Sequence, residues 1–297
     1  MKERFQDRER KRMQIIRKGN RMETGMEIHK EGGFCYLTFP ALAATGAVEH
    51  LFSTRLGGVS EGCLGSMNLS YTRGDEKENV DENFRRIATA LNRKVTEFVF
   101  TDQTHTANVR VADARDAGCG IVRERGYHDV DGLVTNDPGI VLCAFFADCV
   151  PLFFVDPIRR VIGLSHSGWK GTVHKIGKET VQTMRREFGC DPADIVAAVG
   201  PSICGDCYEV SEDVAEQFRQ AFSEDTGAVL REKGGGKYLL DLWEANRLVM
   251  KEAGILEEHI SVTDLCTCCN PEFLFSHRAS HGKRGNLGAF LALRREI

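Results

Sequence analysis

The sequence predicts an α+β fold in a single domain, built from layered mixed sheets. Short apolar runs are frequent along the chain, whereas long helical patterns are few and fall between and after them. Strands and helices therefore do not alternate regularly, which favours α+β layering over a repeated βαβ arrangement. No Pro- or Ser-rich linker, repeat or low-complexity block divides the 297 residues, and 42% of them are hydrophobic, enough for one sizeable core.

The predicted strands are short, mostly apolar runs bounded by polar or turn residues. They cover Phe34–Phe39, His50–Ser53, Phe98–Thr101, Asn108–Val111, Gly132–Thr135, Ile140–Phe146, Leu152–Val155, Val161–Ser165, Ile195–Val199 and Leu287–Leu293.

Four helices are predicted because apolar residues recur every three or four positions. Their apolar stripes run from Val80 to Leu91, from Val173 to Phe188, from Val214 to Phe222 and from Leu242 to Val249. Ser211 suits the N-cap of the third helix. The glycine-rich segment Glu232–Lys237 is expected to be a mobile loop between a helix and a strand.

Residues 1–25 are expected to form a basic, flexible extension in front of one catalytic domain that spans residues 26–297. Nine Lys or Arg stand against three acidic residues within positions 1–22. Such an arm could contact nucleic acid or a membrane surface, but a solvated tail is the more common outcome. The whole chain has a net charge of −4, which gives no general reason to expect either partner.

A cytoplasmic location is expected from what the sequence lacks. No apolar run approaches the roughly 20 residues that cross a bilayer, and the first residues lack the apolar segment of a secretory signal. The eleven cysteines are therefore expected to be reduced thiols, mostly small buried hydrophobic residues, and not a disulfide framework.

Two motifs place a cysteine and a histidine at the ends of predicted strands. Cys149 follows the run 140–146, with Asp148 beside it, and His166 follows the run 161–164 in Ser-His-Ser-Gly-Trp-Lys-Gly. A thiolate and an imidazole held in this way suit either a zinc site or a Cys–His nucleophile pair, in which Asp148 could orient a ligand or a base. His105, after another short apolar run, is the candidate third ligand.

Several polar residues are candidates for binding an anionic or polar substrate. Arg55 lies in Ser-Thr-Arg-Leu-Gly-Gly and offers a fork suited to phosphate or carboxylate. Lys170 lies close to a predicted helix start, where free N–H groups favour an anion. The remaining candidates are Asn68, Gln103 and Arg278.

Two cysteine clusters leave a second metal site open. Cys204 and Cys207 have the C-x-x-C spacing, and Cys266, Cys268 and Cys269 follow after 58 intervening residues. The second cluster is interpreted as lacking that spacing, so buried thiols are preferred over a structural zinc.

Taken together and in this order, the motifs resemble the YlmD/YfiH-like family, long labelled multicopper polyphenol oxidases or laccase-domain proteins and now described as purine nucleoside phosphorylases. The motifs are 53–60, 102–105, 131–135, 147–151, 166–171, 200–210 and 266–278. The resemblance covers roughly residues 30 to 295. It implies a layered α/β/β/α-type domain with a zinc ion in its pocket.

Matched position by position, the resemblance puts the metal ligands at His105, Cys149 and His166, and a phosphate-binding arginine at Arg55. Lys170 replaces the family's usual arginine, so it would supply a point charge where the family has a fork. Zn²⁺ is expected, with copper a weaker alternative, because the nine histidines include no H-x-H pair of the kind that multicopper sites use.

The implied activity is phosphorolysis of a purine nucleoside, with adenosine, inosine, guanosine and methylthioadenosine as candidate substrates. The family is also credited with adenosine deamination, and one metal site could serve both reactions. Three alternatives stay open: a Cys–His hydrolase acting on an amide, such as one that edits peptidoglycan precursors; a non-catalytic binding protein that keeps zinc for stability; and copper-based phenol oxidation. We expect a monomer or a homodimer, and no nucleic-acid or membrane partner.

Overall fold

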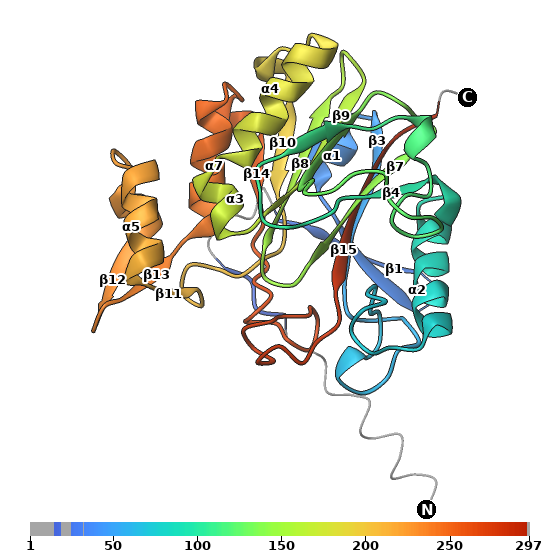
Figure 1. The fold of residues 1–297 in the computed structure, drawn as a ribbon, viewed down its shortest axis with the longest axis horizontal. Coiled ribbons are helices and arrows are strands. Elements are labelled where there is room, and N and C mark those ends of the chain that lie inside the picture. Colours follow the sequence, from blue (N-terminus) through green and yellow to red (C-terminus); the bar gives the residue numbers. More distant parts are fainter. Residues whose placement is uncertain (1–14, 19–24, 32, 296–297) are drawn as a thin grey trace, which may run out of the picture.

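The computed structural model describes residues 15–18, 25–31 and 33–295. The fold has four layers: one helix, two six-stranded sheets and a group of helices. Figure 1 shows helix α2 on one side of the strands and helices α3, α4 and α7 on the other. The expected α+β class and its α/β/β/α layering are confirmed.

The first sheet has the strand order β1-β2-β3-β15-β7-β4. Its neighbours are antiparallel except for the β4–β7 pair, which is parallel. The strands are β1 (Glu27–Glu31), β2 (Phe34–Thr38), β3 (Val48–Ser53), β15 (Leu287–Leu293), β7 (Val141–Phe146) and β4 (Phe98–Phe100).

The second sheet has the strand order β14-β10-β8-β9-β6-β5, with parallel pairs at both edges, β14–β10 and β6–β5. The strands are β14 (Ile260–Val262), β10 (Val196–Val199), β8 (Val150–Asp156), β9 (Val161–Ser167), β6 (Gly132–Thr135) and β5 (Val109–Val111).

The central strands of each large sheet are buried on both faces. On β7, Ala144 faces the core between the sheets and Cys143 faces the helix side; on β8, Phe153 and Phe154 divide in the same way. Successive side chains on a strand point to opposite faces, so a strand buried on both sides needs apolar residues at every position. This is why these strands could be recognised as continuous apolar runs.

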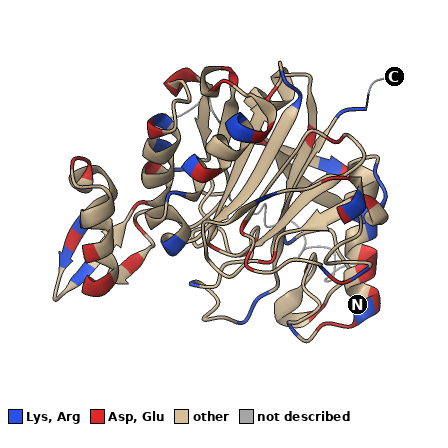
Figure 2. Cartoon of the chain, turned by 45° about the horizontal axis from the view of Figure 1, so that its top comes forward, with Lys and Arg blue, Asp and Glu red and all other residues tan. Residues whose placement is uncertain are grey.

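Amphipathic helices cover the two outer faces. Helix α2 (Lys77–Ala90) buries Val80, Phe84 and Ile87 against the first sheet, and α4 (Ile176–Phe188) buries Val181 and Met184 against the second. The other helices are α1 (Pro40–Ala44), α3 (Trp169–Val173), α5 (Glu212–Ala221), α6 (Thr226–Val229) and α7 (Leu242–Glu252). Charged side chains gather on the helices and loops, and the central strands carry almost none (Figure 2).

A third, small sheet projects beside α5 with the order β11-β13-β12. It consists of β11 (Glu209–Ser211), β13 (Lys237–Leu240) and β12 (Leu230–Gly234). The prediction of a mobile loop at 232–237 was therefore wrong: β12 and β13 pair as a hairpin, and glycines 234–236 all have positive φ in its turn. Glycine tolerates this conformation at no steric cost.

One further prediction differs from the structure in detail. The predicted helix from Val173 to Phe188 is divided into α3 and α4, because Lys175 adopts a left-handed conformation with φ 56° between them. Within the N-terminal extension, described residues 15–18 lie against the domain: Arg17 pairs with Asp264 at 2.5 Å. The rest of that segment, apart from residue 25, lies outside the described residues.

None of the helices in the described part of the chain is long and apolar enough to cross a membrane.

Candidate metal centre and substrate cavity

Cys149 lies in the short connection that carries the chain from the first sheet to the second. β7 ends at Phe146 and β8 begins at Val150. Asp148 has φ 89° in this turn, and its two carboxylate oxygens accept hydrogen bonds from Thr267 Oγ1 at 2.6 Å and from the Arg278 amide at 2.7 Å. Asp148 does not line the cavity described below, and its carboxylate instead joins the turn to residues 267 and 278.

His166 is the penultimate residue of β9 and is 3% exposed. Its Nδ1 donates to Asp131 Oδ1 at 2.8 Å, and Asp131 is fully buried. This hydrogen bond assigns the proton to Nδ1 in the neutral imidazole and leaves Nε2 as the free lone pair. A carboxylate that fixes a histidine tautomer in this way is typical of metal-ligating histidines.

The same carboxylate also holds the loop that presents His105. Asp131 accepts hydrogen bonds from the backbone amides of residues 104, 105 and 106, at 3.2, 3.2 and 2.8 Å, and from Thr106 Oγ1 at 2.9 Å. His105 itself has φ 68°, a conformation that such a network can maintain. Asp131 thus organises two members of the site. The sequence showed it only as the start of a motif.

The trio His105, Cys149 and His166 has a geometry that fits one metal ion. Its three ligand atoms lie within 4.8 Å of one another, and Cys149 Sγ is 4.0 Å from His105 Nε2. A Cβ on Gly168 would lie 2.8 Å from His105 Cδ2 and 3.3 Å from Cys149 Sγ, so only glycine lets the backbone pass this close. Two imidazoles and one thiolate are a donor set that suits Zn²⁺ and leaves a fourth position open.

Cys149 and His166 stabilise each other's charged forms in the metal-free protein. Burial alone would raise the pKa of the Cys149 thiol, but the charge of His166 and a hydrogen bond from His105 outweigh it and lower the pKa to about 6. Burial opposes the imidazolium of His166, yet the Cys149 thiolate and the Asp131 carboxylate raise its pKa to about 9. A thiolate is therefore available to a metal, or as a nucleophile, at neutral pH.

The trio opens into a cavity of about 520 Å³, a size within the usual range for small-molecule sites. Aromatic and cationic side chains line it. Phe145 stacks on Phe100 with ring centroids 4.6 Å apart, and three arginines that the sequence analysis had not selected also line the cavity. They are Arg73, Arg125 and Arg284.

Two of these arginines have unused hydrogen-bonding capacity. The Nε atoms of Arg125 and Arg284 are buried without a hydrogen-bond partner. Burial, together with the charge of Arg73, lowers the pKa of Arg284 to about 10, so it still carries its charge at neutral pH. Two neighbouring guanidinium groups repel each other, and an anion bound between them would relieve that repulsion.

Of the candidate substrate-binding residues, only Gln103 lines this cavity. Its amide bonds both backbone groups of Phe145, accepting from N at 2.8 Å and donating to O at 2.7 Å. Asn68 is fully buried and uses its carbonyl to hold the amides of Ser70 and Asn286, two residues that do line the cavity. Asn68 therefore positions the wall without forming it.

The other three candidates for binding phosphate or substrate, Arg55, Lys170 and Arg278, lie outside the lining of this cavity. Arg55 donates to the backbone oxygens of Gly65 and Pro271, at 2.9–3.0 Å and 2.5 Å. Arg278 donates to the backbone oxygens of Cys207 and Glu209. Lys170 is exposed on α3, with its ammonium 5.6 Å from the Trp169 ring centroid.

A four-layer α/β/β/α domain with a His–Cys–His trio beneath a cation-lined cavity defines a class of protein with a candidate mononuclear metal centre. Comparison with known proteins shows the family: the sequence model described as "Multi-copper polyphenol oxidoreductase laccase" matches residues 49–294. The chain belongs to this family.

Named relatives and solved structures resemble the chain over most of its length. It is 39% identical over 247 residues to "Purine nucleoside phosphorylase YlmD" of Bacillus subtilis, covering 82% of this chain and 87% of that protein. It is 37% identical over 229 residues to "Adenosine deaminase RL5" of an unknown prokaryotic organism, covering 76% and 87%. The crystal structure of the hypothetical protein YfiH of Bacillus licheniformis superimposes with a TM-score of 0.85 at 33% identity, covering 90% and 99%. The expected resemblance to the YlmD/YfiH-like family is thereby confirmed.

Proposed function

We propose that this chain is a zinc-dependent purine nucleoside phosphorylase, and that the cavity above His105, Cys149 and His166 is its active site. The observation that carries the proposal is the cavity itself, because it combines the trio, an aromatic wall and buried cations. The name of the Bacillus subtilis relative, a purine nucleoside phosphorylase, supports the same reaction.

In phosphorolysis, a phosphate oxygen forms a bond to the anomeric carbon of the nucleoside while the bond to the purine nitrogen breaks. The products are ribose 1-phosphate and the purine, whose nitrogen takes the electron pair and then a proton. Arg73, Arg125 and Arg284, which line the cavity, would bind the phosphate. Phe145, half-buried and stacked on Phe100, would form a flat wall for the base.

His105, Cys149 and His166 would hold the zinc ion, which when bound supplies a Lewis acid and lowers the pKa of a coordinated water. Asp131 keeps His166 in the tautomer that presents Nε2, and Asp148 keeps the cysteine turn in place. Zinc is favoured over a set of coppers because the described residues contain one histidine-bearing cluster of potential ligands, and the other such cluster is made of cysteines alone.

Adenosine deamination is a second candidate activity of the same site, supported by the similarity to the prokaryotic relative named as an adenosine deaminase. A cysteine hydrolase is the rival mechanism, supported by the lowered pKa of Cys149 beside His166. Activity that survives removal of the metal and disappears when Cys149 is alkylated would favour the hydrolase.

The test is chromatography of the products that purified protein makes from adenosine, with and without phosphate. Wild type and the matched control Cys63→Ser, an exposed cysteine outside the cavity, are expected to yield adenine and ribose 1-phosphate only when phosphate is present. Cys149→Ala should lose both products. Inosine as the sole product would favour the deaminase. No turnover of any purine nucleoside by zinc-loaded wild type would overturn both activities.

A further inference from the structure

Four cysteines converge at one edge of the second sheet, away from the trio. Cys204 and Cys207 follow β10, and Cys266 and Cys269 follow β14. β10 and β14 are parallel neighbours, so the segments that follow them leave the sheet at the same end. A parallel β-bridge joins Ser202 to Cys266 there. The topology therefore brings together two pairs of cysteines that lie about 60 residues apart in sequence.

Each pair has the spacing of a metal-binding turn. Cys204–Cys207 is C-x-x-C, and Cys266–Cys269 is C-x-x-C as well, with Cys268 as an additional cysteine inside it. The sequence interpretation that the second cluster lacks this spacing was wrong, because it counted the cysteines as a run and missed the two that are three positions apart. Two such pairs are the pattern of a structural zinc site.

We propose that Cys204, Cys207, Cys266 and Cys269 bind a second, structural zinc ion. Their four sulfur atoms lie within 4.8 Å of one another, and Cys207 Sγ is 3.4 Å from Cys269 Sγ. Tetrahedral zinc with Zn–S bonds of about 2.3 Å needs sulfurs about 3.8 Å apart, so only small adjustments are required.

Two backbone amides are directed at one of the four sulfur atoms. The amides of Cys204 and Cys269 both donate to Cys266 Sγ, at 3.3 and 3.4 Å. Hydrogen bonds from amides to a ligand atom fix that atom and favour its charged form. The Lys18 ammonium, which binds Asp206 between the first two cysteines at 3.3 Å, adds a nearby positive charge.

Neither a disulfide nor simple burial explains the cluster as well. All four cysteines are free thiols in the structure, and 3.4 Å is far longer than the roughly 2.05 Å of a disulfide bond. Burial alone places cysteines singly, as at Cys35, Cys143 and Cys190. Four sulfurs meeting from two separate segments, two of them only partly buried, are what a fully coordinated metal requires.

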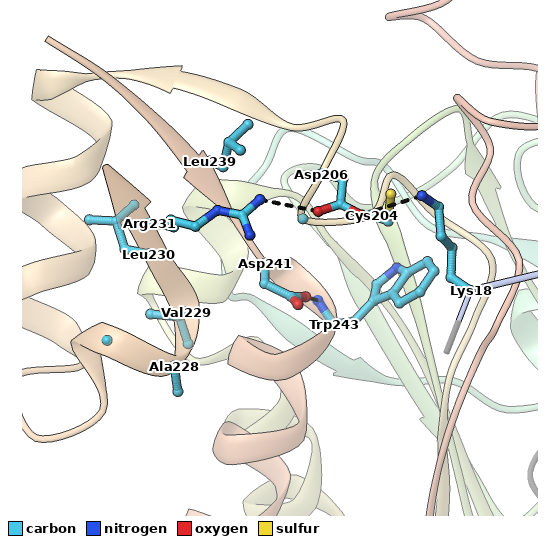
Figure 3. Close-up of a pocket in the computed structure, with 12 residues that line it drawn as sticks. Lys18, Cys204, Asp206, Ala228, Val229, Leu230, Arg231, Leu239, Asp241 and Trp243 are labelled. Carbon is cyan, nitrogen blue, oxygen red and sulfur yellow. Dashed lines mark hydrogen bonds and ion pairs between the residues drawn. The ribbon is translucent and has the colours of Figure 1, made fainter. Parts of the chain in front are cut away.

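A cavity provides an entry path for the metal. It has a volume of about 270 Å³ and includes Cys204, Asp206 and Lys18 in its lining. Figure 3 shows Cys204 and Lys18 close together at one end of it, with Arg231 farther along. An accessible path is one of the features that a genuine site needs in addition to its ligands.

The bound ion would lock the segment that supports the active-site cysteine. Thr267, between the two ligands Cys266 and Cys269, donates to Asp148 Oδ1 at 2.6 Å. The carbonyl of Cys207 accepts from Arg278, whose amide binds the other Asp148 oxygen. All four coordination positions would be filled by protein, so this zinc would stabilise structure and leave no position for substrate.

The test counts zinc per chain in protein purified under reducing conditions. Wild type and the matched control Cys268→Ser are expected to hold two zinc ions, and the double variant Cys204→Ser/Cys207→Ser one. Cys149→Ala/His166→Ala should also hold one, which separates this site from the proposed active site. The inference is overturned if the Cys204→Ser/Cys207→Ser variant binds as much zinc as wild type.

A second measurement covers the case in which the double variant does not fold. Native wild type is alkylated before and after zinc chelation, and the modified cysteines are mapped by mass spectrometry, with exposed Cys63 as the reactive internal standard. The four ligands should be protected before chelation and reactive afterwards. Equal reactivity in both states, or a Cys207–Cys269 disulfide in the unreduced protein, would refute the metal site. Neither readout depends on nucleoside turnover.

Discussion

Replacing Asp131 by asparagine removes the charge that links His166 to the His105 loop, and its cost can be worked out from the structure. Asp131 Oδ1 accepts from His166 Nδ1 and the His105 amide, and Oδ2 accepts from Thr106 Oγ1 and from the amides of residues 104 and 106. Asparagine has one acceptor oxygen, so in either orientation its NH₂ group faces at least two donors. The site is fully buried, so water cannot replace the lost acceptor.

We expect Asp131→Asn to lower the free energy of unfolding by about 3–6 kcal/mol, from two lost hydrogen bonds to a charged group at about 1.5–3 kcal/mol each. Loss of the carboxylate partner of a histidine ligand should also weaken zinc binding by about 10–100-fold. Urea denaturation followed by circular dichroism measures the first effect, and competition with a chromogenic chelator measures the second.

The matched control is Asp129→Asn, two residues away and exposed. Asp129 accepts one side-chain hydrogen bond, from Thr104 at 2.7 Å, so its loss should cost no more than about 1 kcal/mol. If Asp131→Asn unfolds at the same urea concentration as this control and binds zinc within about threefold of wild type, the organising role assigned to Asp131 is wrong.

Three more predictions concern the site. In metal-free protein, the rate of Cys149 alkylation should have its midpoint near pH 6 and fall below that pH as the thiolate takes a proton, because the two imidazoles lower the pKa of the thiol to about 6. A midpoint near pH 9 would contradict the pairing of Cys149 with the imidazoles. Gly168→Ala should weaken zinc binding by about tenfold or more, since its Cβ would lie 2.8 Å from a ligand ring, whereas Gly126→Ala, with nothing within 4 Å, should leave binding unchanged. Arg284→Gln should raise the KM for phosphate by about 10–100-fold, the worth of one charge-assisted hydrogen bond, while Lys170→Gln should not; steady-state kinetics with adenosine in excess decides between the two assignments.

The longest strands that the sequence predicted are buried on both faces. The run 140–146 appears as β7 and the run 287–293 as β15, because burial on two sides leaves a continuous apolar signal. Five strands were missed, β1, β11, β12, β13 and β14. Two of them are polar edge strands: β1 has the sequence EIHKE and β12 has LREKG. Their pairing partners, not their own composition, make them strands.

For the site, the local motifs located the potential metal ligands but not the substrate cavity. Cys149 and His166 are adjacent because β8 and β9 pair, and both motifs follow apolar runs that are visible in the sequence. Arg55 shows the limit: an arginine can bind a phosphate or cap backbone carbonyls, and only the fold decides that it does the latter. Arg73 and Arg284 carry no local signal, since they reach the cavity through loops placed by contacts distant in sequence.

The three potential metal ligands come from both large sheets and from the connections between them. Cys149 sits where the chain crosses between the two large sheets, His166 belongs to the second sheet, and His105 lies in the connection from β4 in the first sheet to β5 in the second. An ion held by all three would cross-link the two sheets. Any shift of one sheet relative to the other would therefore change the metal–ligand distances. Side chains packed between the layers, such as Phe153 and Ala144, would then adjust the metal geometry without touching metal or substrate. Substitutions in the core between the sheets would therefore change the metal geometry and, with it, the rate of a reaction at the site.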